Sequence, residues 1–418
     1  MNNMREKIVK DFLVRKFCAY GFLKNLKFFE PYLIIYLLGI GQSLFSIGVL
    51  YAIREGITYL FEIPSGVIAD NYGRKKELMS CFVFYIISFF LFFAGTNFFV
   101  LVLAMIFFGL GEAFRSGTHK AMIYSYLEKK GWFSEKTFVY GRTRSFSLAG
   151  SSISSFLSIL FVLNLPAMKW IFVICTIPYL LDFILIWTYP DYLDERSSSN
   201  FTFKGFLQII VKSIREISQR PILRKILLSS SIFDGLFRAI KDYIQPIMAI
   251  LVLSTLVNGA AADGSEDLLK ISLGVIYGIF YIFSAFASRN AFRLHRIARS
   301  ARLMNFSFAL LGVAFLLLSL TIAAEWTVLV TIVYFVLYVM KDARRPIFVD
   351  ISGDWMNREE RATVMSLDSQ LRSLVTIIAA PMAGLMADMF SIPVMFLVFG
   401  ILILLTSKTV YITEPYGR

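Results

Sequence analysis

Long apolar stretches separated by short polar connections run along the whole chain. Residues 78–111 contain no Asp, Glu, Lys or Arg, and the same holds for 145–168, 243–262, 303–324 and 389–407. A helix crosses a bilayer core about 30 Å thick with roughly 20 apolar residues. These stretches therefore predict transmembrane helices.

Apolar runs that are interrupted by isolated charges bring the predicted helices to twelve. The predicted spans cover 17–40, 43–70, 75–95, 98–126, 137–164, 168–189, 223–256, 270–290, 300–322, 326–352, 361–388 and 391–412. We therefore expect an all-α integral membrane protein with two six-helix bundles, at 1–190 and 223–418. The cytoplasmic linker at 191–222 is expected to hold an amphipathic helix, because 201–217 mixes large apolar residues with Lys and Arg.

Basic residues occur in every second connection. The connections near 41–43, 96–98, 165–168, 257–269, 323–325 and 389–391 contain no Lys or Arg, whereas the others contain clusters such as Arg74-Lys75-Lys76. Lys and Arg are retained on the cytoplasmic side of a membrane. The sequence therefore predicts a multi-pass protein of the cytoplasmic (inner) membrane with both termini in the cytoplasm.

The composition excludes a soluble enzyme. Apolar residues make up 57% of the 418 residues and charged residues only 17%, against about 25% charged in an average soluble protein. The three cysteines have no paired spacing, and the two histidines, His119 and His295, are far apart. No metal site, disulfide framework or cofactor is expected, and no Gly-rich loop for ATP is present.

A motif rich in glycine and basic residues follows span two. It reads Gly66-Val67-Ile68-Ala69-Asp70-Asn71-Tyr72-Gly73-Arg74-Lys75-Lys76. The motif resembles the signature of the loop between spans two and three in the major facilitator superfamily. Arg361-Ala362-Thr363 and the segment 381–388 are also similar to bacterial members. The topology extends the resemblance over essentially the whole chain.

The resemblance implies the major facilitator fold, in which two bundles rock about a cavity lined mainly by spans one, four, seven and ten. It also implies a conformational latch formed by Gly66, Asp70, Gly73 and Arg74, with Asp70 facing the N-terminus of span eleven. Met105 stands where the antiporter signature of span four has Arg, which counts against proton-driven multidrug efflux. Because the fold normally works as one chain, we expect a monomer.

Many ionisable residues fall within the predicted spans, where a charge needs a partner, a cavity or a function. Bases outnumber acids there, and several bases share a helix face at about 100° per residue. Because Lys and Arg bind carboxylate, phosphate and sulfate groups, we expect an anion-binding cavity. Its candidate substrate-binding residues are Arg115, Lys120, Arg144, Lys241, Arg238, Arg344 and Arg345.

The acids and His119 allow two interpretations. Burial drives a carboxylate toward binding a proton, so the candidates for coupling to a proton or ion are Glu55, Glu62, Glu112, His119 and Asp234. The alternative is that acids such as Glu112, Asp234 and Asp368 only neutralise nearby bases and hold helices together. For Asp182 in span six we expect a structural role.

The leading hypothesis is a secondary active transporter that moves a small solute, an organic or inorganic anion, by alternating access. The alternative is proton-coupled efflux of lipophilic drugs or cations, which would require an unpaired carboxylate in an aromatic cavity. An integral membrane enzyme is a third hypothesis, but no catalytic constellation supports it. The expected partners are the solute, the lipid bilayer and a coupling proton or ion, without nucleic acid.

Overall fold

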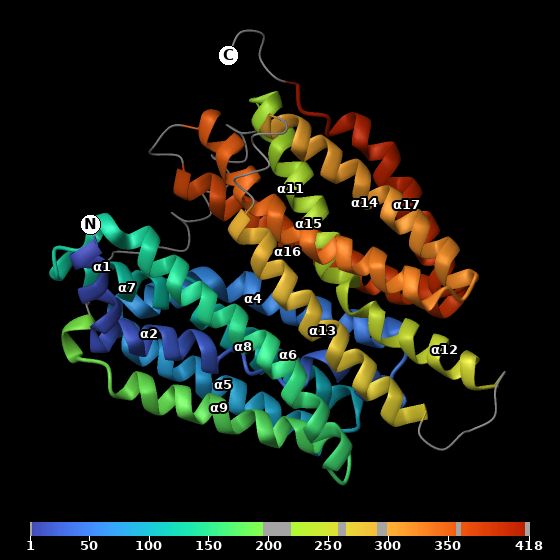
Figure 1. Cartoon of the computed structure of the whole chain (residues 1–418), viewed down its shortest axis with the longest axis horizontal. Helices are drawn as coiled ribbons and strands as arrows, with labels where there is room; N and C mark the ends of the chain where they lie inside the picture. Colours follow the sequence, from blue (N-terminus) through green and yellow to red (C-terminus); the bar gives the residue numbers. More distant parts are fainter. Residues whose placement is uncertain (1, 195–218, 258–264, 291–298, 357–360, 414–418) are drawn as a thin grey trace. The chain divides into compact units, whose positions relative to one another are not determined.

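The computed structural model describes residues 2–194, 219–257, 265–290, 299–356 and 361–413. Within these residues all regular structure is helical (Figure 1). The amphipathic helix expected within 191–222 and the acidic connection 257–269 lie largely outside the described residues.

The first part of the chain folds into long helices joined by short turns. These are α1 Asn2–Lys10, α2 Phe12–Leu23, η1 Glu30–Tyr32, α3 Leu33–Gly39, α4 Leu44–Tyr72, α5 Arg74–Ala94, α6 Phe98–Arg115, α7 Thr118–Lys129, η2 Phe133–Glu135, α8 Lys136–Asn164, α9 Trp170–Trp187 and η3 Asp191–Leu193.

The rest of the described chain continues the pattern. Its helices are α11 Pro221–Ile240, η4 Lys241–Tyr243, α12 Ile244–Val257, α13 Ser265–Asn290, α14 Ser300–Ala323, α15 Thr327–Asp354, α16 Arg361–Met389 and α17 Ile392–Thr409.

Each of the twelve predicted spans coincides with one α-helix or with two, and in spans one and seven a short 3-10 helix lies between the two. Nine helices of the described chain are long and apolar enough to cross a membrane by themselves. The other three spans are one, seven and ten. Spans one and seven are each broken into shorter helices, and α15 in span ten carries Lys341, Asp342, Arg344 and Arg345.

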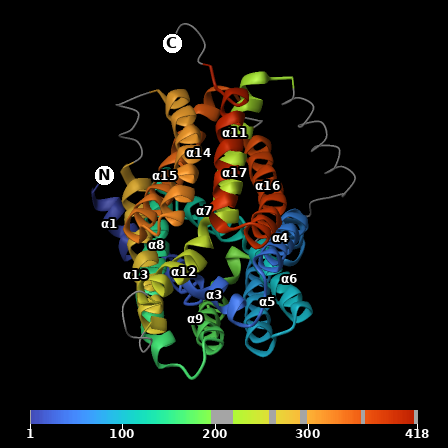
Figure 2. The ribbon, with the colours of Figure 1, turned by 90° about the vertical axis from the view of Figure 1, so that its right-hand side faces the viewer.

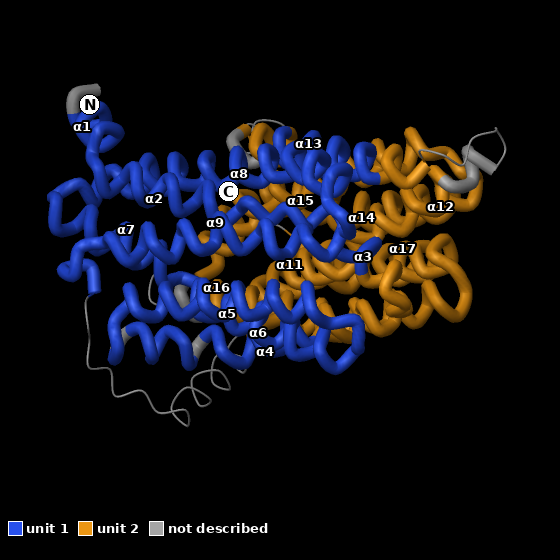
Figure 3. Tube along the Cα trace, turned by 90° about the horizontal axis from the view of Figure 1, so that it is seen from below, with its two compact units in different colours: residues 1–36, 53–200, 270–282 blue, residues 37–52, 201–269, 283–418 orange. Residues whose placement is uncertain are grey.

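Contacts divide the chain into two compact units (Figure 3). Unit 1 contains 1–36, 53–200 and 270–282, and unit 2 contains 37–52, 201–269 and 283–418. The segments 37–52 and 270–282 thus group with helices from the other half of the sequence. The boundaries expected from the sequence, 1–190 and 223–418, remain a prediction about the sequential bundles.

Aromatic side chains form the core of unit 1. Here α5 packs against both α6 and α9, and α2 lies along α9 (Figure 1). The ring of Tyr179 on α9 meets Phe82, Tyr85 and Phe89 of α5 at centroid distances of 5.6, 5.1 and 4.9 Å. Edge-to-face pairs of this kind hold helices together where lipid removes the hydrophobic driving force.

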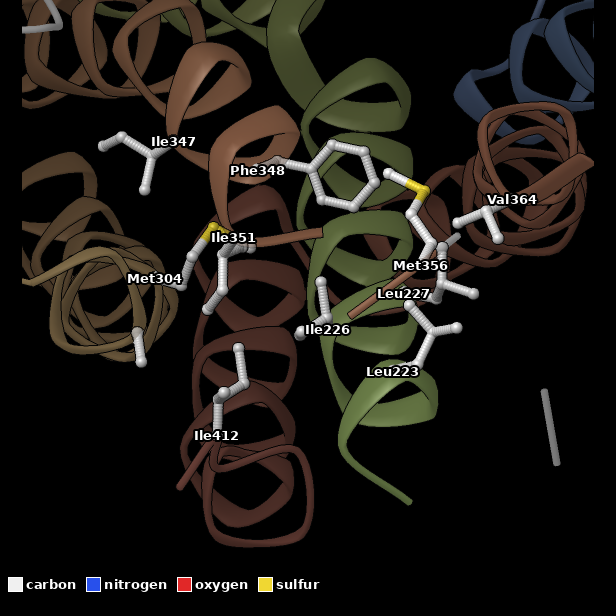
Figure 4. Packing of buried hydrophobic residues seen from close by; sticks show 11 residues of the cluster. Leu223, Ile226, Leu227, Met304, Ile347, Phe348, Ile351, Met356, Val364 and Ile412 are labelled. Carbon is white, nitrogen blue, oxygen red and sulfur yellow. The ribbon is translucent and has the colours of Figure 1, made fainter. Parts of the chain in front are cut away.

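Unit 2 has an aliphatic core at one end of its helices. Figure 2 shows α14 beside α11 and α17, in agreement with their contacts. Leu227 of α11, Met304 of α14 and Ile351 of α15 are buried in one cluster, and Phe348 lies beside Met356 (Figure 4). Dispersion contacts in a close-packed cluster stabilise this end of the unit.

A close helix crossing explains why the start of α4 belongs to unit 2. A Cβ atom on Gly48 would collide with the carbonyl oxygen of Ala380 on α16, and one on Gly384 would collide with that of Leu44. The Asp388 carboxylate also accepts hydrogen bonds from the backbone N–H groups of Leu44 (3.1 Å) and Phe45 (2.7 Å). Asp388 therefore satisfies two of the free donors at the N-terminus of α4.

We predict that Gly384→Ala lowers the free energy of unfolding by about 1–3 kcal/mol, because the added methyl group meets rigid backbone of α4. The matched control is Gly353→Ala in α15, where an added Cβ has nothing within 4 Å. This control should change stability by less than about 1 kcal/mol. Thermal unfolding of the purified variants measures both. Equal effects of the two substitutions would contradict the close crossing.

Candidate functional site

Predicted spans one, four and seven are each interrupted, spans one and seven near the middle and span four in its last third. Span one breaks between α2 and η1, span four between α6 and α7, and span seven at η4. Irregular backbone within a membrane is tolerated where other groups satisfy its polar atoms or where it lines a cavity. The breaks therefore mark candidate positions for solute binding.

The break in span one exposes polar backbone that nearby side chains satisfy. The Asn25 side chain donates to the carbonyl of Gly21 at 2.6 Å, and the Tyr179 hydroxyl of α9 donates to the carbonyl of Lys24 at 3.1 Å. The next helical segment then begins at Glu30, with Pro31 in its first turn. Lys24 therefore lies at the C-terminal end of α2 and not within a continuous helix.

The break in span four is built on a glycine. Gly117 has a φ of +79°, a conformation that a residue with a side chain rarely adopts. The Ser116 hydroxyl before it donates to Glu62 at 2.7 Å, and the Thr118 hydroxyl after it donates to Glu77 at 2.7 Å. Two carboxylates of unit 1 thus hold the ends of α6 and α7.

A cavity of about 200 Å³ lies in unit 1 beside both of these breaks. It is formed by residues of α2, α7 and α8 together with the two breaks: Phe17, Tyr20, Gly21, Lys24, Arg115, Gly117, His119, Lys120, Ile123, Tyr140, Thr143, Arg144 and Ser147. Gly21 permits the close approach of α2 to α8, since a Cβ there would lie 2.8 Å from the Ser147 hydroxyl oxygen.

Positive charge predominates around this cavity. Glu112 pairs with both Lys27, at 3.3 Å, and Arg115, so one carboxylate serves two cations. Within the described chain the ammonium of Lys120 contacts only aromatic rings, those of Tyr124 and Tyr140. A cation of this kind attracts an anion strongly when water is excluded.

Lys24 and Arg144 complete the set of bases at the cavity. Lys24 lies 5.4 Å from the ring of Tyr20, and in the described part of the chain neither Lys24 nor Arg144 forms an ion pair with a carboxylate. His119 stacks on Tyr20 with ring centroids 3.7 Å apart, and its Nε2 lies 3.3 Å from the Tyr189 hydroxyl.

The structure brings four of the residues predicted from the sequence to this cavity: Arg115, Lys120, Arg144 and His119. Glu112 lies next to them through Arg115. Glu62 instead binds Ser116 at the break, and Glu55 pairs with Arg54 at 3.3 Å. Sequence reasoning did not select Lys24 or Tyr20 for the site. The polar pair Lys24-Asn25 in the middle of a span was the available signal.

The candidate substrate-binding residues of unit 2 largely form ion pairs with acidic residues. Lys241 pairs with Asp242 at 2.9 Å, and Arg345 pairs with Asp368 at 2.7 Å. Asp368 also pairs with Arg372, which lies 3.4 Å from Asp234. In the described chain Arg238 also has an interacting partner.

Arg344 differs from its neighbours. Its guanidinium is buried, donates to Ser229 at 2.6 Å and lies 4.2 Å from the centre of the Phe233 ring. Its Nε and Nη1 atoms have no hydrogen-bond partner in the described structure. The candidate residues of unit 2 remain predictions about substrate binding.

The glycine motif after span two forms a tight corner. Gly73 has a φ of +103° and precedes α5, and Arg74 donates to Ser125 at 3.0 Å. The Asp194 carboxylate accepts from the backbone N–H of Lys75 at 2.8 Å. Gly66 is exposed, and the Asp70 side chain lies outside what the structure describes.

A salt bridge adds to this corner. The Lys75 ammonium donates to Asp191 at 2.9 Å, and this hydrogen bond together with the positive charge of Lys75 lowers the pKa of the Asp191 carboxyl. A lowered pKa means that the contact stabilises the fold above the unfolded-state pKa and is lost as pH falls through the folded-state value.

A multi-span helical protein with interrupted helices around a charged cavity has the architecture of a membrane transporter. The family model described as Major Facilitator Superfamily matches residues 16–340. The chain therefore belongs to the major facilitator superfamily. It is a secondary transporter that binds a small solute, and it is not an enzyme. In the described residues no group of His, Cys, Asp and Glu could hold a metal ion.

Similar proteins include one sequence relative and several solved structures of the same fold. An uncharacterized MFS-type transporter, YxaM of Bacillus subtilis (strain 168), is 24% identical over 383 residues, covering 90% of this chain and 89% of the relative. A variant of the nucleoside transporter NupG matches with a TM-score of 0.80 at 12% identity, over 96% of this chain and 100% of that one. A D-xylose–proton symporter matches with a TM-score of 0.68 at 12% identity, over 97% of this chain and 98% of that one.

We predict that Gly73→Ala destabilises the protein more than Gly131→Ala does. Both glycines have positive φ angles, so both substitutions strain the backbone by about 1–2 kcal/mol. Only at Gly73 would the new Cβ also collide with the Asp194 carboxylate, whereas Gly131 has nothing within 4 Å. The difference in unfolding free energy should be on the order of 1–3 kcal/mol. A smaller effect at Gly73 would exclude the Asp194 contact.

Proposed function

We propose that the protein transports a small organic or inorganic anion, and that the cavity of unit 1 binds it. The observation that carries the proposal is the set of bases at the cavity. Lys24, Lys120 and Arg144 line it without a carboxylate partner in the described chain. An anionic group would compensate these charges through charge-assisted hydrogen bonds.

The helix geometry favours the same kind of ligand. Gly117, which lines the cavity, is the N-cap residue of α7. The N-terminus of a helix carries partial positive charge and free N–H donors. The α7 dipole therefore adds to the field of Lys120 and Arg144 and gives the anion a second type of partner.

The size of the cavity limits the solute. A volume of about 200 Å³ is equivalent to several water molecules at roughly 30 Å³ each. This suits a small carboxylate, sulfate or phosphate with a short or single-ring body. The rings of Phe17, Tyr20 and Tyr140 at the wall would contact an apolar body.

The topology belongs to the same proposal. Basic connections alternate with connections that lack Lys and Arg, which supports an inner-membrane protein with both termini in the cytoplasm. The corner at Gly73 and Arg74 then lies on the cytoplasmic side, where it would act as a latch between transport states. Arg238, Lys241, Arg344 and Arg345 are proposed to contribute bases from unit 2.

The test is a comparison of melting temperatures of the purified protein with different ligands. The probes are sulfate, fumarate and benzenesulfonate, with uncharged uridine and the lipophilic cation tetraphenylphosphonium as contrasts, all at matched ionic strength. A ligand at 100 times its Kd stabilises the folded state by about 2.7 kcal/mol. We predict upward shifts with one or more of the anions and none with the contrasts.

The variant Arg144→Ala should bind the anion with an affinity at least tenfold lower than that of the wild type. The matched control is Arg142→Ala on the same helix, because Arg142 is not among the residues that line the cavity. It should bind the anion like the wild type. Shifts with tetraphenylphosphonium alone would contradict the proposal and favour efflux of lipophilic cations.

A further inference from the structure

Asp182 is a completely buried carboxyl group in α9. Its exposed fraction is 0%, and neither of its oxygen atoms has a hydrogen-bond partner in the described structure. Glu112 and Asp368, by contrast, each pair with two cations. Among the described residues, no hydrogen bond of Asp182 supports the structural role that we expected for it.

The helices around Asp182 supply few groups that could compensate a negative charge. α5 faces it with Cys81, α2 faces it with Tyr20, and α9 and its end supply Tyr179 and Tyr189. Lys24 is the cation whose charge acts on Asp182, and the charges of Arg115, Glu112, Lys27 and Arg144 act on Lys24 in turn. The Tyr20 hydroxyl is also buried without a hydrogen-bond partner in the described chain.

An isolated carboxylate in such surroundings is very costly to keep ionised, whereas the neutral acid is tolerated. The charge on Asp182 thus depends on whether a cation comes within reach. Lys24 is that cation, and it also lines the cavity of unit 1. Tyr179, one helical turn before Asp182, donates to the carbonyl of Lys24 at 3.1 Å and so fastens the break in span one to α9.

We propose that Asp182 is the binding site of a coupling proton and that Lys24 links this site to the anion in the cavity. The inference rests on the proposed function for its second half. When Lys24 bonds the anion, the Asp182 carboxylate takes up one proton from water and becomes a neutral carboxylic acid. When the anion leaves, Lys24 turns to Asp182, the O–H bond releases its proton to water, and an ammonium–carboxylate pair remains.

This competition for Lys24 makes anion and proton bind together, as a proton–anion symporter requires. Linkage is reciprocal, so anion binding must promote proton uptake and protons must promote anion binding. The affinity for the anion then falls as pH rises through the range where Asp182 loses its proton. For one coupled proton the decrease is at most about tenfold per pH unit.

The first measurement is proton uptake when benzenesulfonate, fumarate or sulfate binds to the whole protein in weakly buffered detergent solution between pH 6 and pH 8. These probes stay ionised in this range, so any proton taken up binds to the protein. The wild type should take up close to one proton per bound anion at pH values where the anion-free protein has lost the Asp182 proton and the anion-bound protein keeps it. Anion binding without proton uptake across the whole range would overturn the inference and leave the proposed function standing.

The variants are Asp182→Asn and Lys24→Met, with Asp191→Asn as the control for the same change at an exposed carboxylate. Asp182→Asn mimics the neutral acid, so it should bind the anion with an affinity independent of pH and without proton uptake. Asp191→Asn should behave as the wild type. Proton uptake that persists in Asp182→Asn would assign the proton to another group.

Infrared difference spectra of wild type minus Asp182→Asn give an answer that needs no anion. A carboxylic acid C=O band should be present at pH 6 and disappear on alkalinisation, and Lys24→Met should retain it to higher pH. If none of the three anions binds but the band is present, the proposed function fails and the proton site stands. Absence of the band at pH 6 overturns the proton site whether or not an anion binds.

Discussion

The structure depends on the requirement that every backbone polar group within a membrane find a hydrogen-bond partner. Regular helices meet it for their own backbone, so a helix that breaks must find other partners. In unit 1 the partners are side chains: Tyr179 and Asn25 at the break in span one, and Glu62 at the break in span four. The same breaks release Lys24 and Gly117 to the cavity. The breaks that need these partners are therefore the same breaks that border the cavity.

The two units differ in how their charged side chains are compensated. In unit 2 the arginine residues largely meet acids, as Arg345 and Arg372 do at Asp368, and such networks hold helices together with little net gain in stability. In unit 1 one carboxylate, Glu112, serves Lys27 and Arg115, while Lys24, Lys120 and Arg144 form no ion pair with a carboxylate in the described chain. An anionic solute that compensates these charges would make the loaded and empty forms differ in energy.

The sequence predicts the membrane fold well, because helix length and the placement of Lys and Arg follow directly from the thickness and polarity of a bilayer. It predicts less of the site. The structure places Arg115 and His119, both selected from the sequence, at the cavity, but a helical period assumes continuous helices, so the breaks at Lys24 and Gly117 were missed. Pairing across helices is equally invisible in the sequence. Lys241 and Arg345 pair with acids in the structure, whereas neither carboxylate oxygen of Asp182, expected to be structural, has a hydrogen-bond partner among the described residues.

The most direct test of the central claim, an anion completing the bases of unit 1, is uptake of labelled benzenesulfonate, fumarate and sulfate into proteoliposomes that contain the purified protein. The account predicts saturable accumulation of at least one of them when the outside is more acidic than the inside, with loss of uptake in Arg144→Ala. Uptake restricted to tetraphenylphosphonium or uridine, with no transport of any of the three anions under either direction of the proton gradient, would contradict it.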